Sequence, residues 1–265
     1  MPLTHLIILS LIQGLTEFLP VSSSGHLIIV PNLLSWQDQG LIIDVAVHAG
    51  SLLAVIIYLW RDLWGMALAM IDFRNLRENP NLKLAQVTIV ASLPVMVAGL
   101  IVSLFLDDFA RNLEIIGWAT LGFGILLGLS DKIGMTLNEL KHIQFLDSIL
   151  IGLSQVLALI PGASRSGLTI TMARFLGYNR TAAARFSLLL AIPAILGASA
   201  LKGFELAKSQ DAILGIDVAI VTTVSFAAAF ASISIMMNWL NKAGFMPFVI
   251  YRIILGISLL AWVYL

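Results

Sequence analysis

Two short polar segments interrupt a sequence that is otherwise strongly apolar. The first reads QGLTEFLPVSSSGH, residues 13–26, and the second reads PGASRSGLT, residues 161–169. Between them they place Glu17, His26 and Arg165 among long apolar runs. An ionisable side chain inside a membrane costs roughly 2.5 to 3.5 kcal/mol, so each of the three is a candidate for a functional role.

Both segments contain the residue types that bind phosphate at the start of a helix. Serine is a preferred N-cap residue, so we expect one helix to begin within Ser22–Ser24 and another near Ser164. A helix N-terminus offers free backbone N–H groups and the positive end of its dipole. Arg165 adds a bidentate donor, so we predict an anion site that suits phosphate better than carboxylate. Its other expected donors are Ser22, Ser24, Gly25, Ser164, Ser166 and Gly167.

The first segment also carries residues that could act on a bound phosphate. Gln13 and Glu17 lie four residues apart, so a helix presents both on one face. A carboxylate beside phosphate must be protonated or bind a divalent cation, and Mg²⁺ commonly bridges carboxylates and substrate phosphates. Ser23 lies three residues and Ser22 four residues before His26, so either hydroxyl could meet the imidazole as a nucleophile meets its base. The predicted chemistry is hydrolysis of a phosphate ester or anhydride whose lipid tail lies in the bilayer.

Each of these residues also has a structural interpretation. The serines alone would be ordinary N-caps that allow close helix packing, and His26 a hydrogen-bonded packing residue. The glutamate and the arginine would form a buried ion pair that joins the two segments. Their joint occurrence on two segments favours the chemical interpretation. For Asp44, His48 and Arg252, in contrast, we expect structural pairing or snorkelling.

The composition places the chain among membrane proteins. Of its 265 residues, 59% are hydrophobic and 11% are charged, against roughly 25% charged in soluble domains. Apolar runs of about 20 residues can cross a bilayer as helices. We expect six of them, at 41–60, 84–106, 113–130, 186–204, 213–237 and 247–265. Residues 1–265 are therefore predicted to form a single, all-α, polytopic integral membrane domain.

The same composition excludes several kinds of site. The chain has no cysteine, which excludes disulfides, thiolate metal sites and cysteine nucleophiles. Its net charge is zero, and it has no basic block of the kind that binds nucleic acid. Any electrostatic function must therefore be local.

Two further apolar segments, 3–35 and 146–177, are each broken by one of the polar segments. Their halves, about 12 to 15 residues long, are too short to cross a membrane, so each is expected to form a re-entrant hairpin whose loop lines a cavity. The two segments match without gaps at an offset of 142 residues, and the matches are Gln13 with Gln155, Leu15 with Leu157, Ser22 with Ser164, Ser24 with Ser166, Gly25 with Gly167 and Ile28 with Ile170. Three spans lie between them, which predicts an inverted repeat, with copies at about 1–130 and 143–265 and a site where the two loops meet.

The distribution of lysine and arginine predicts the orientation of the chain. One side of the predicted topology carries ten of these residues and the other carries three. The ten are Arg61, Arg74, Arg77, Lys83, Lys132, Lys141, Arg174, Arg180, Arg185 and Lys242, and the three are Arg111, Lys202 and Lys208. The side with ten is expected to be cytoplasmic, which places both termini and the mouth of the first hairpin outside the cytoplasm.

The two polar segments resemble the signatures of the bacitracin-resistance type undecaprenyl-diphosphate phosphatases. That family has an (E/Q)xxxE motif leading into PVSSxGH and a second motif PGxSRSxxT, and the sequence matches both at every motif position. The resemblance extends to HAGSLLAV at 48–55, FSLLLAIP at 186–193 and PFVIYR at 247–252. It implies a polytopic enzyme of the bacterial inner membrane that hydrolyses undecaprenyl diphosphate to undecaprenyl phosphate and phosphate. This reaction recycles the carrier lipid for peptidoglycan and other envelope polymers, and it raises tolerance to bacitracin, which sequesters the diphosphate.

The resemblance also implies which residues are functional. Carried over by motif position, they are Gln13, Glu17, Ser23, His26, Ser164, Arg165 and Thr169. It further implies a divalent cation, Mg²⁺ or Ca²⁺. Gln13 stands where the family accepts either glutamate or glutamine, which weakens the expectation that two carboxylates hold the metal. The site is expected to open to the periplasmic side, and the sequence leaves the oligomeric state open, with a homodimer as one option.

The mechanism we predict is in-line attack of Ser23 on the terminal phosphorus, with His26 as general base and later proton donor. Glu17, helped by Gln13, would hold the cation, and the donors of the second segment would stabilise the transferring phosphoryl group. Direct attack by water, with Ser23 only a ligand, is the alternative mechanism. The alternative function is a lipid-phosphate flippase or an anion transporter, because inverted repeats with broken helices are a transporter architecture.

Overall fold

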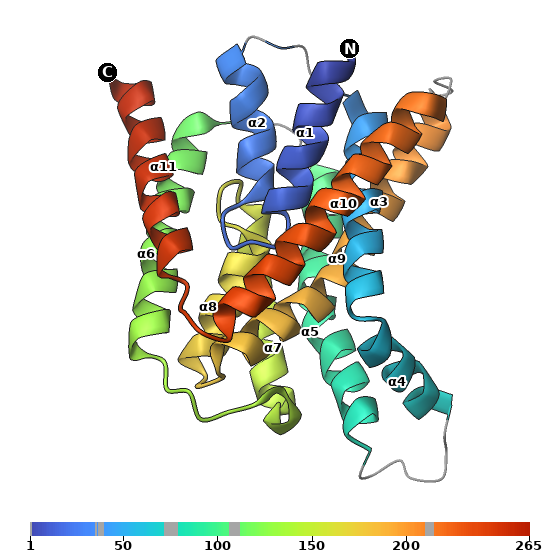
Figure 1. The fold of residues 1–265 in the computed structure, drawn as a ribbon, viewed down its shortest axis with the longest axis vertical. Coiled ribbons are helices and arrows are strands. Elements are labelled where there is room, and N and C mark those ends of the chain that lie inside the picture. The colour runs from blue at the N-terminus through green and yellow to red at the C-terminus, as the bar shows by residue number, and fades with distance from the viewer. Residues whose placement is uncertain (1, 35, 37–39, 72–78, 106–111, 210–214) are drawn as a thin grey trace.

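The chain is almost entirely helical. The computed structural model describes residues 2–34, 36, 40–71, 79–105, 112–209 and 215–265, without the side chains of residues 105 and 202–209. Its α-helices are α1 (Leu3–Thr16), α2 (Ser23–Leu34), α3 (Gly40–Tyr58), α4 (Trp60–Ile71), α5 (Pro80–Phe105), α6 (Leu113–Ile133), α7 (Phe145–Val156), α8 (Arg165–Phe175), α9 (Arg180–Ser209), α10 (Gly215–Leu240) and α11 (Met246–Tyr264) (Figure 1). The described residues form no β-strand. The prediction of an all-α protein is therefore confirmed.

Six of the described helices are long and apolar enough to cross a membrane: α3, α5, α6, α9, α10 and α11. They correspond to the six predicted runs, so the chain is a multi-pass membrane protein. Helices α5 and α9 begin earlier than predicted, at Pro80 and Arg180. Their first turns contain charged residues, which lower the hydropathy but do not interrupt helical hydrogen bonding. Residues 106, 213 and 214, at two predicted ends, lie outside the described residues.

Helix α4 is the element that hydropathy did not predict. It has only 12 residues, too few for a span. Trp64 and Leu68 are exposed on it, while the Asp62 carboxylate accepts a hydrogen bond from Arg185 Nε at 3.0 Å. A short helix that exposes apolar side chains and carries a charged contact at its start is typical of the membrane interface.

The two polar segments join pairs of short helices. Residues 17–22 connect α1 to α2, and a 3₁₀ turn at Leu157–Leu159 and residues 160–164 connect α7 to α8. In Figure 1, α1 and α2 lie in the half of the molecule that carries both termini, and α7 and α8 lie in the opposite half. Helix α1 packs on α10 and α3, α7 packs on α5, and α8 packs on α6 and α9. Both pairs are therefore held by long helices.

The packing of α1 on α10 depends on Gly14. A Cβ atom at this position would lie 2.5 Å from the Ser225 carbonyl oxygen and 2.7 Å from Ala228 Cβ. Gly14→Ala should therefore push α1 away from α10 and destabilise the fold by about 1–3 kcal/mol. The measurement is the midpoint of thermal unfolding in detergent. Gly122→Ala is the matched control, because nothing lies within 4 Å of the added atom; equal midpoints for both variants would contradict this packing.

Charged residues tie several helices together at the end of the molecule opposite the termini. The Asp131 carboxylate at the end of α6 accepts hydrogen bonds from Arg180 Nε at 2.6 Å and from the backbone N–H of Phe245 at 3.0 Å. Tyr178 lies between α8 and α9 and donates its hydroxyl to Asp147 at 2.5 Å. Burial and the adjacent carboxylate raise the pKa of Tyr178. These contacts fix the ends of α6, α7, α9 and α11 relative to one another.

Candidate active site

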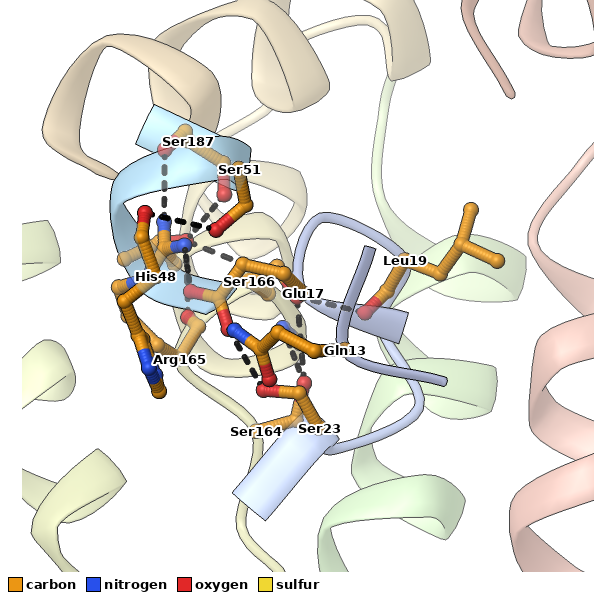
Figure 2. Close-up of polar contacts among 12 residues, drawn as sticks. Gln13, Glu17, Leu19, Ser23, His48, Ser51, Ser164, Arg165, Ser166 and Ser187 are labelled. Atoms are coloured by element: carbon orange, nitrogen blue, oxygen red, sulfur yellow. Dashed lines mark hydrogen bonds and ion pairs between the residues drawn. The ribbon is translucent and has the colours of Figure 1, made fainter. Parts of the chain in front are cut away.

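The Glu17 carboxylate is the point at which the two polar segments meet (Figure 2). Its Oε2 atom accepts hydrogen bonds from Gln13 Nε2 at 2.8 Å and from Ser23 Oγ at 2.7 Å. Its Oε1 atom accepts one from Arg165 Nη2 at 3.0 Å. The side chains of Glu17 and Arg165 are only 8% and 13% exposed. A shielded ion pair therefore joins two segments that are 148 residues apart in the sequence.

Each segment reaches this point through a serine with a positive φ angle. Ser22 and Ser164 have φ angles of 73° and 72°, in the left-handed region that residues other than glycine rarely adopt. A helix starts directly after each of them. The Ser22 hydroxyl accepts from the backbone N–H of Gly25 at 3.4 Å, and the Ser164 hydroxyl accepts from that of Gly167 at 3.1 Å. The two predicted helix starts are thus confirmed.

These turns place two helix N-termini in the site. The N–H groups of a first helical turn have no partner within their own helix, and they lie at the positive end of the helix dipole. Ser24 is exposed at the start of α2, whereas the Ser166 hydroxyl is buried and donates to the Leu19 carbonyl at 2.8 Å. Ser166 therefore uses its hydroxyl to join the two loops, and its backbone N–H is the group expected to meet an anion.

Thr169 and Ser187 support Arg165 through hydrogen bonds. Arg165 Nη1 donates to the Ser187 carbonyl at 3.2 Å. The Thr169 hydroxyl lies 2.8 Å from Ser187 Oγ and 3.0 Å from the Arg165 carbonyl oxygen, and Thr169 is only 1% exposed. In the structure the Thr169 hydroxyl thus supports the arginine, and its binding of substrate stays a prediction.

The expected hydrogen bond between Ser23 and His26 does not form. The Ser23 hydroxyl donates to Glu17. The imidazole of His26 lies with Nδ1 at 2.7 Å from the Ser22 carbonyl oxygen and with Nε2 at 2.5 Å from the Tyr251 hydroxyl. The prediction from their three-residue spacing assumed that both residues lie within a helix, which would bring Ser23 and His26 together. Ser23 is its first residue, after a left-handed turn that directs the hydroxyl toward α1, so Glu17 is the acceptor next to Ser23.

Arg252 supports both loops from α11. It is fully buried, so the alternative of snorkelling is wrong and structural pairing is confirmed. Its guanidinium donates to carbonyl oxygens of both connecting segments and of α6, which are those of Pro20 at 3.3 Å, Gly162 at 3.2 Å, Ala163 at 3.0 Å, Ala119 at 3.4 Å and Thr120 at 3.1 Å. Pro20 and Gly162 are themselves 142 residues apart, so one arginine binds matching carbonyl groups of the two segments.

Comparison with known proteins shows which family the chain belongs to. A model of the family described as bacitracin resistance protein BacA matches residues 6–258. The chain belongs to this family. It is 44% identical to undecaprenyl-diphosphatase 1 of Rhodospirillum rubrum over 272 residues, which cover 100% of this chain and 96% of the relative. It is 45% identical to undecaprenyl-diphosphatases of Roseobacter denitrificans and Hahella chejuensis, with 100% and 98% of both chains covered, respectively.

Three further residues contact the site without having been predicted in it. Ser187 bonds to Arg165, Tyr251 bonds to His26, and His48 lies close enough to Glu17 for an electrostatic interaction. His48 Nδ1 also bonds to the Asp44 carbonyl oxygen at 2.7 Å, as the expected structural pairing requires. All three lie in the segments 48–55, 186–193 and 247–252. These segments carry the family resemblance outside the two motifs. That resemblance was the signal in the sequence from which the three residues could have been predicted.

Proposed function

We propose that the two polar segments, residues 13–26 and 161–169, form the active site of an undecaprenyl-diphosphate phosphatase. The observation that carries this proposal is the set of contacts at Glu17, whose carboxylate accepts hydrogen bonds from the Ser23 hydroxyl and from the Arg165 guanidinium. In the proposal, Ser23 is the nucleophile, Glu17 its proton acceptor and Arg165 the phosphate-binding group. The family supports the same substrate, since its curated relatives are named undecaprenyl-diphosphatase. The protein hydrolyses undecaprenyl diphosphate to undecaprenyl phosphate and inorganic phosphate.

Substrate binding exchanges the partners of Arg165. The terminal phosphate of the lipid enters between the N-termini of α2 and α8, and the guanidinium moves from Glu17 to the phosphate oxygens, which it can bind bidentately. The negative charge of the substrate thereby replaces that of Glu17 as the partner of the arginine. The Glu17 carboxylate, released from Arg165, takes up the Ser23 proton at Oε2, the oxygen that already accepts from this hydroxyl.

The reaction then proceeds in two displacements. Ser23 Oγ forms a bond to the terminal phosphorus, its proton passes to Glu17, and the bond from that phosphorus to the bridging oxygen breaks to release undecaprenyl phosphate. Water next attacks the phosphoserine phosphorus, and Ser23 recovers its proton from Glu17 as the Oγ–P bond breaks. One proton of the water stays on the phosphate and the other passes to solvent. Arg165 and the free N–H groups of both helices stabilise the transferring phosphoryl group throughout.

The residues present fit a divalent cation that is held mainly by the substrate. Gln13 Oε1 is buried without a hydrogen-bond partner, and it adjoins the Glu17 carboxylate through the amide group of the same side chain. Among the described residues, no group of three or more His, Asp or Glu could hold an ion alone. We propose that Glu17 and Gln13 contribute oxygen ligands to an ion such as Mg²⁺ or Ca²⁺, which when bound neutralises charge on the diphosphate.

The substitution Gln13→Glu tests whether Glu17 and Gln13 are ligands of the ion. A second carboxylate should strengthen ion binding, so we expect half-maximal activity at about a tenfold lower Mg²⁺ concentration, equivalent to about 1.4 kcal/mol. Gln13→Ala should have the opposite effect, because it removes an oxygen ligand without adding charge. A Mg²⁺ dependence that is the same in both variants and in the wild type would place the ion elsewhere.

We further infer that α1–α2 and α7–α8 are re-entrant hairpins in an inverted repeat, with copies at about 1–130 and 143–265. The equal φ angles of Ser22 and Ser164 support this, and so do their neighbouring hydroxyl contacts: Ser22 lies 3.4 Å from Ser24, and Ser164 lies 3.2 Å from Ser166. The packing of α1 on α10 and of α7 on α5 is consistent with two such copies. The two loops would then meet within the membrane, as in other folds with broken helices.

The orientation we propose is that of a bacterial inner-membrane protein whose active site opens to the periplasm. Both termini lie at one end of the molecule in Figure 1, and the ends of α6 and α8 that carry Lys132 and Arg174 lie at the other. An excess of lysine and arginine marks the cytoplasmic side. Arg74, Arg77 and Arg111 lie outside the described residues, as do the side chains of Lys202 and Lys208.

The proposed function is tested with purified protein, undecaprenyl diphosphate and Mg²⁺ in detergent. We expect inorganic phosphate and undecaprenyl phosphate to appear in equal amounts. Excess bacitracin should stop the reaction by sequestering the substrate. Absence of phosphate release, together with transport of lipid phosphate or anions across vesicles that contain the protein, would contradict the proposal and favour the flippase or transporter.

A further inference from the structure

The contacts of His26 extend the active site to α11. We propose that Tyr251 is a positioning residue, which holds the His26 imidazole and through it the Ser22 turn that presents Ser23. This inference rests on the proposed function, because its consequence is a faster reaction at Ser23. It differs from the role expected for His26 from the sequence, in which the imidazole bonds directly to the nucleophile.

The two hydrogen bonds of His26 determine the tautomer of its ring. A carbonyl oxygen can only accept, so the nitrogen that lies 2.7 Å from the Ser22 oxygen, Nδ1, carries the proton. In the neutral ring Nε2 then has a lone pair, which accepts the hydroxyl proton of Tyr251 at 2.5 Å. The two rings are nearly parallel, with an interplanar angle of 10° and centroids 5.7 Å apart. Tyr251 thus fixes both the plane and the protonation of the imidazole.

The imidazole in turn holds the Ser22 turn in place. The Ser22 carbonyl accepts from His26 Nδ1 and also from the His26 backbone N–H at 3.3 Å. A positive φ angle is unfavourable in a residue other than glycine, and these bonds offset part of that cost. A change at Tyr251 is therefore transmitted to the residue directly before the nucleophile.

The second loop shows that such a turn does not itself require a histidine clamp. Ser164 has the same φ angle as Ser22, but Leu168 stands at the position that matches His26. The second turn is held instead by the Ser164 and Ser166 hydroxyls, which bond to Gly167 and Leu19. Only the loop with the nucleophile has the imidazole and the tyrosine, so these two groups serve the reaction and not the shape of the turn alone.

Helix α11 holds Tyr251 in place for its hydrogen bond with His26. Arg252, the next residue, is buried among loop carbonyl groups, whereas Tyr251 is 44% exposed and is not needed to fill the core. Arg252 also brings a positive charge to the surroundings of the imidazole. Among the described residues, Glu17 and Arg165 are charged groups that lie beyond Ser23.

The substitution Tyr251→Phe tests the inference, since it keeps the ring and removes the hydroxyl. In the full-length protein we expect kcat to fall about tenfold with KM nearly unchanged, because a misplaced nucleophile affects the chemical step more than binding. The acidic limb of the pH–rate profile should move to higher pH, because the neutral imidazole loses the donor that stabilised it. The ¹⁵N signal of unprotonated Nε2 in histidine-labelled protein should shift, with assignment by subtraction of His26→Gln.

Tyr264→Phe is the matched control, because this second tyrosine of α11 donates its hydroxyl to Glu114 and not to His26. It should leave kcat, the pH profile and the nitrogen signals unchanged. Wild-type values for Tyr251→Phe would overturn the inference, as would a loss of kcat without a change in the His26 signals. If the wild-type protein releases no phosphate, the proposed function fails, but the nitrogen signals still decide whether Tyr251 sets the imidazole.

Discussion

Replacing Arg165 with alanine should lower kcat for undecaprenyl diphosphate by about a thousandfold, the loss typical when an arginine or a donor to a transition-state oxyanion is removed. Arg165 is the described cation that faces Glu17 at hydrogen-bond distance. It also stands at the N-terminus of α8, where an anion is favoured. Phosphate release from the purified variant is the measurement.

The same substitution should also destabilise the protein, because it leaves the Glu17 carboxylate shielded and without its cation. Removal of one partner of a buried ion pair costs about 3–5 kcal/mol. Arg165→Ala combined with Glu17→Gln removes both charges, so the double variant should recover much of the unfolding midpoint. It should not recover activity. This pair of variants separates the loss of catalysis from the loss of stability.

An exposed ion pair provides the matched control for charge removal. Arg185 pairs with Asp62, and its side chain is 47% exposed, so Arg185→Ala should change both stability and turnover little. Wild-type turnover in Arg165→Ala would contradict the assignment of the site. Recovery of activity in the double variant would show that the arginine does not bind phosphate, and it would also reject Glu17 as the proton acceptor.

The membrane helices could be predicted well because hydropathy and length are local properties of the sequence. Six apolar runs correspond to six helices. Helix α4 was missed for the same reason, since its 12 residues are too few for a span and include the charged residues Arg61 and Asp62 in the first turn. The starts of α5 and α9 were predicted too late in the sequence. Their first turns contain charged residues, which lower the hydropathy although the helix includes them.

Local spacing also predicted part of the site. The separation of four residues between Gln13 and Glu17 correctly implied a shared helix face, and their side chains form a hydrogen bond. The offset of 142 residues paired Ser22 with Ser164, and both residues have an unusual positive φ angle. The ion pair between Glu17 and Arg165 had been weighed as an alternative to function. The structure shows such a pair next to Ser23, so a structural and a catalytic role are compatible here.

The rest of the site depends on contacts that local spacing does not encode. The bond from Tyr251 to His26 spans 225 residues, and Arg252 binds Pro20 across 232. The partner of Ser23 was predicted wrongly because helical spacing was applied to a residue at the very start of a helix. Its direction is set by the φ angle of Ser22, which the sequence PVSSSGH does not reveal.

If Ser23 is the nucleophile, replacing it with alanine should lower turnover to about one thousandth of the wild-type rate or less. The hydroxyl is the group that bonds to Glu17 Oε2, and without it no phosphoserine can form. Ser103→Ala is the matched control, because Ser103 is on α5 and its hydroxyl bonds only within that helix, to the Leu100 carbonyl. Phosphate release is again the measurement.

The comparison with Glu17→Gln separates the two mechanisms. If Ser23 attacks, Ser23→Ala should be at least as inactive as Glu17→Gln, since the carboxylate then has no hydroxyl to deprotonate. If water attacks directly, the space left by the Ser23 hydroxyl can hold a water beside the same carboxylate. Ser23→Ala should then lose only a few-fold in kcat, while Glu17→Gln still loses the proton acceptor and becomes inactive. A few-fold loss would therefore reject the phosphoserine but retain Glu17 as the base, because both mechanisms draw the proton to the carboxylate that joins the two segments.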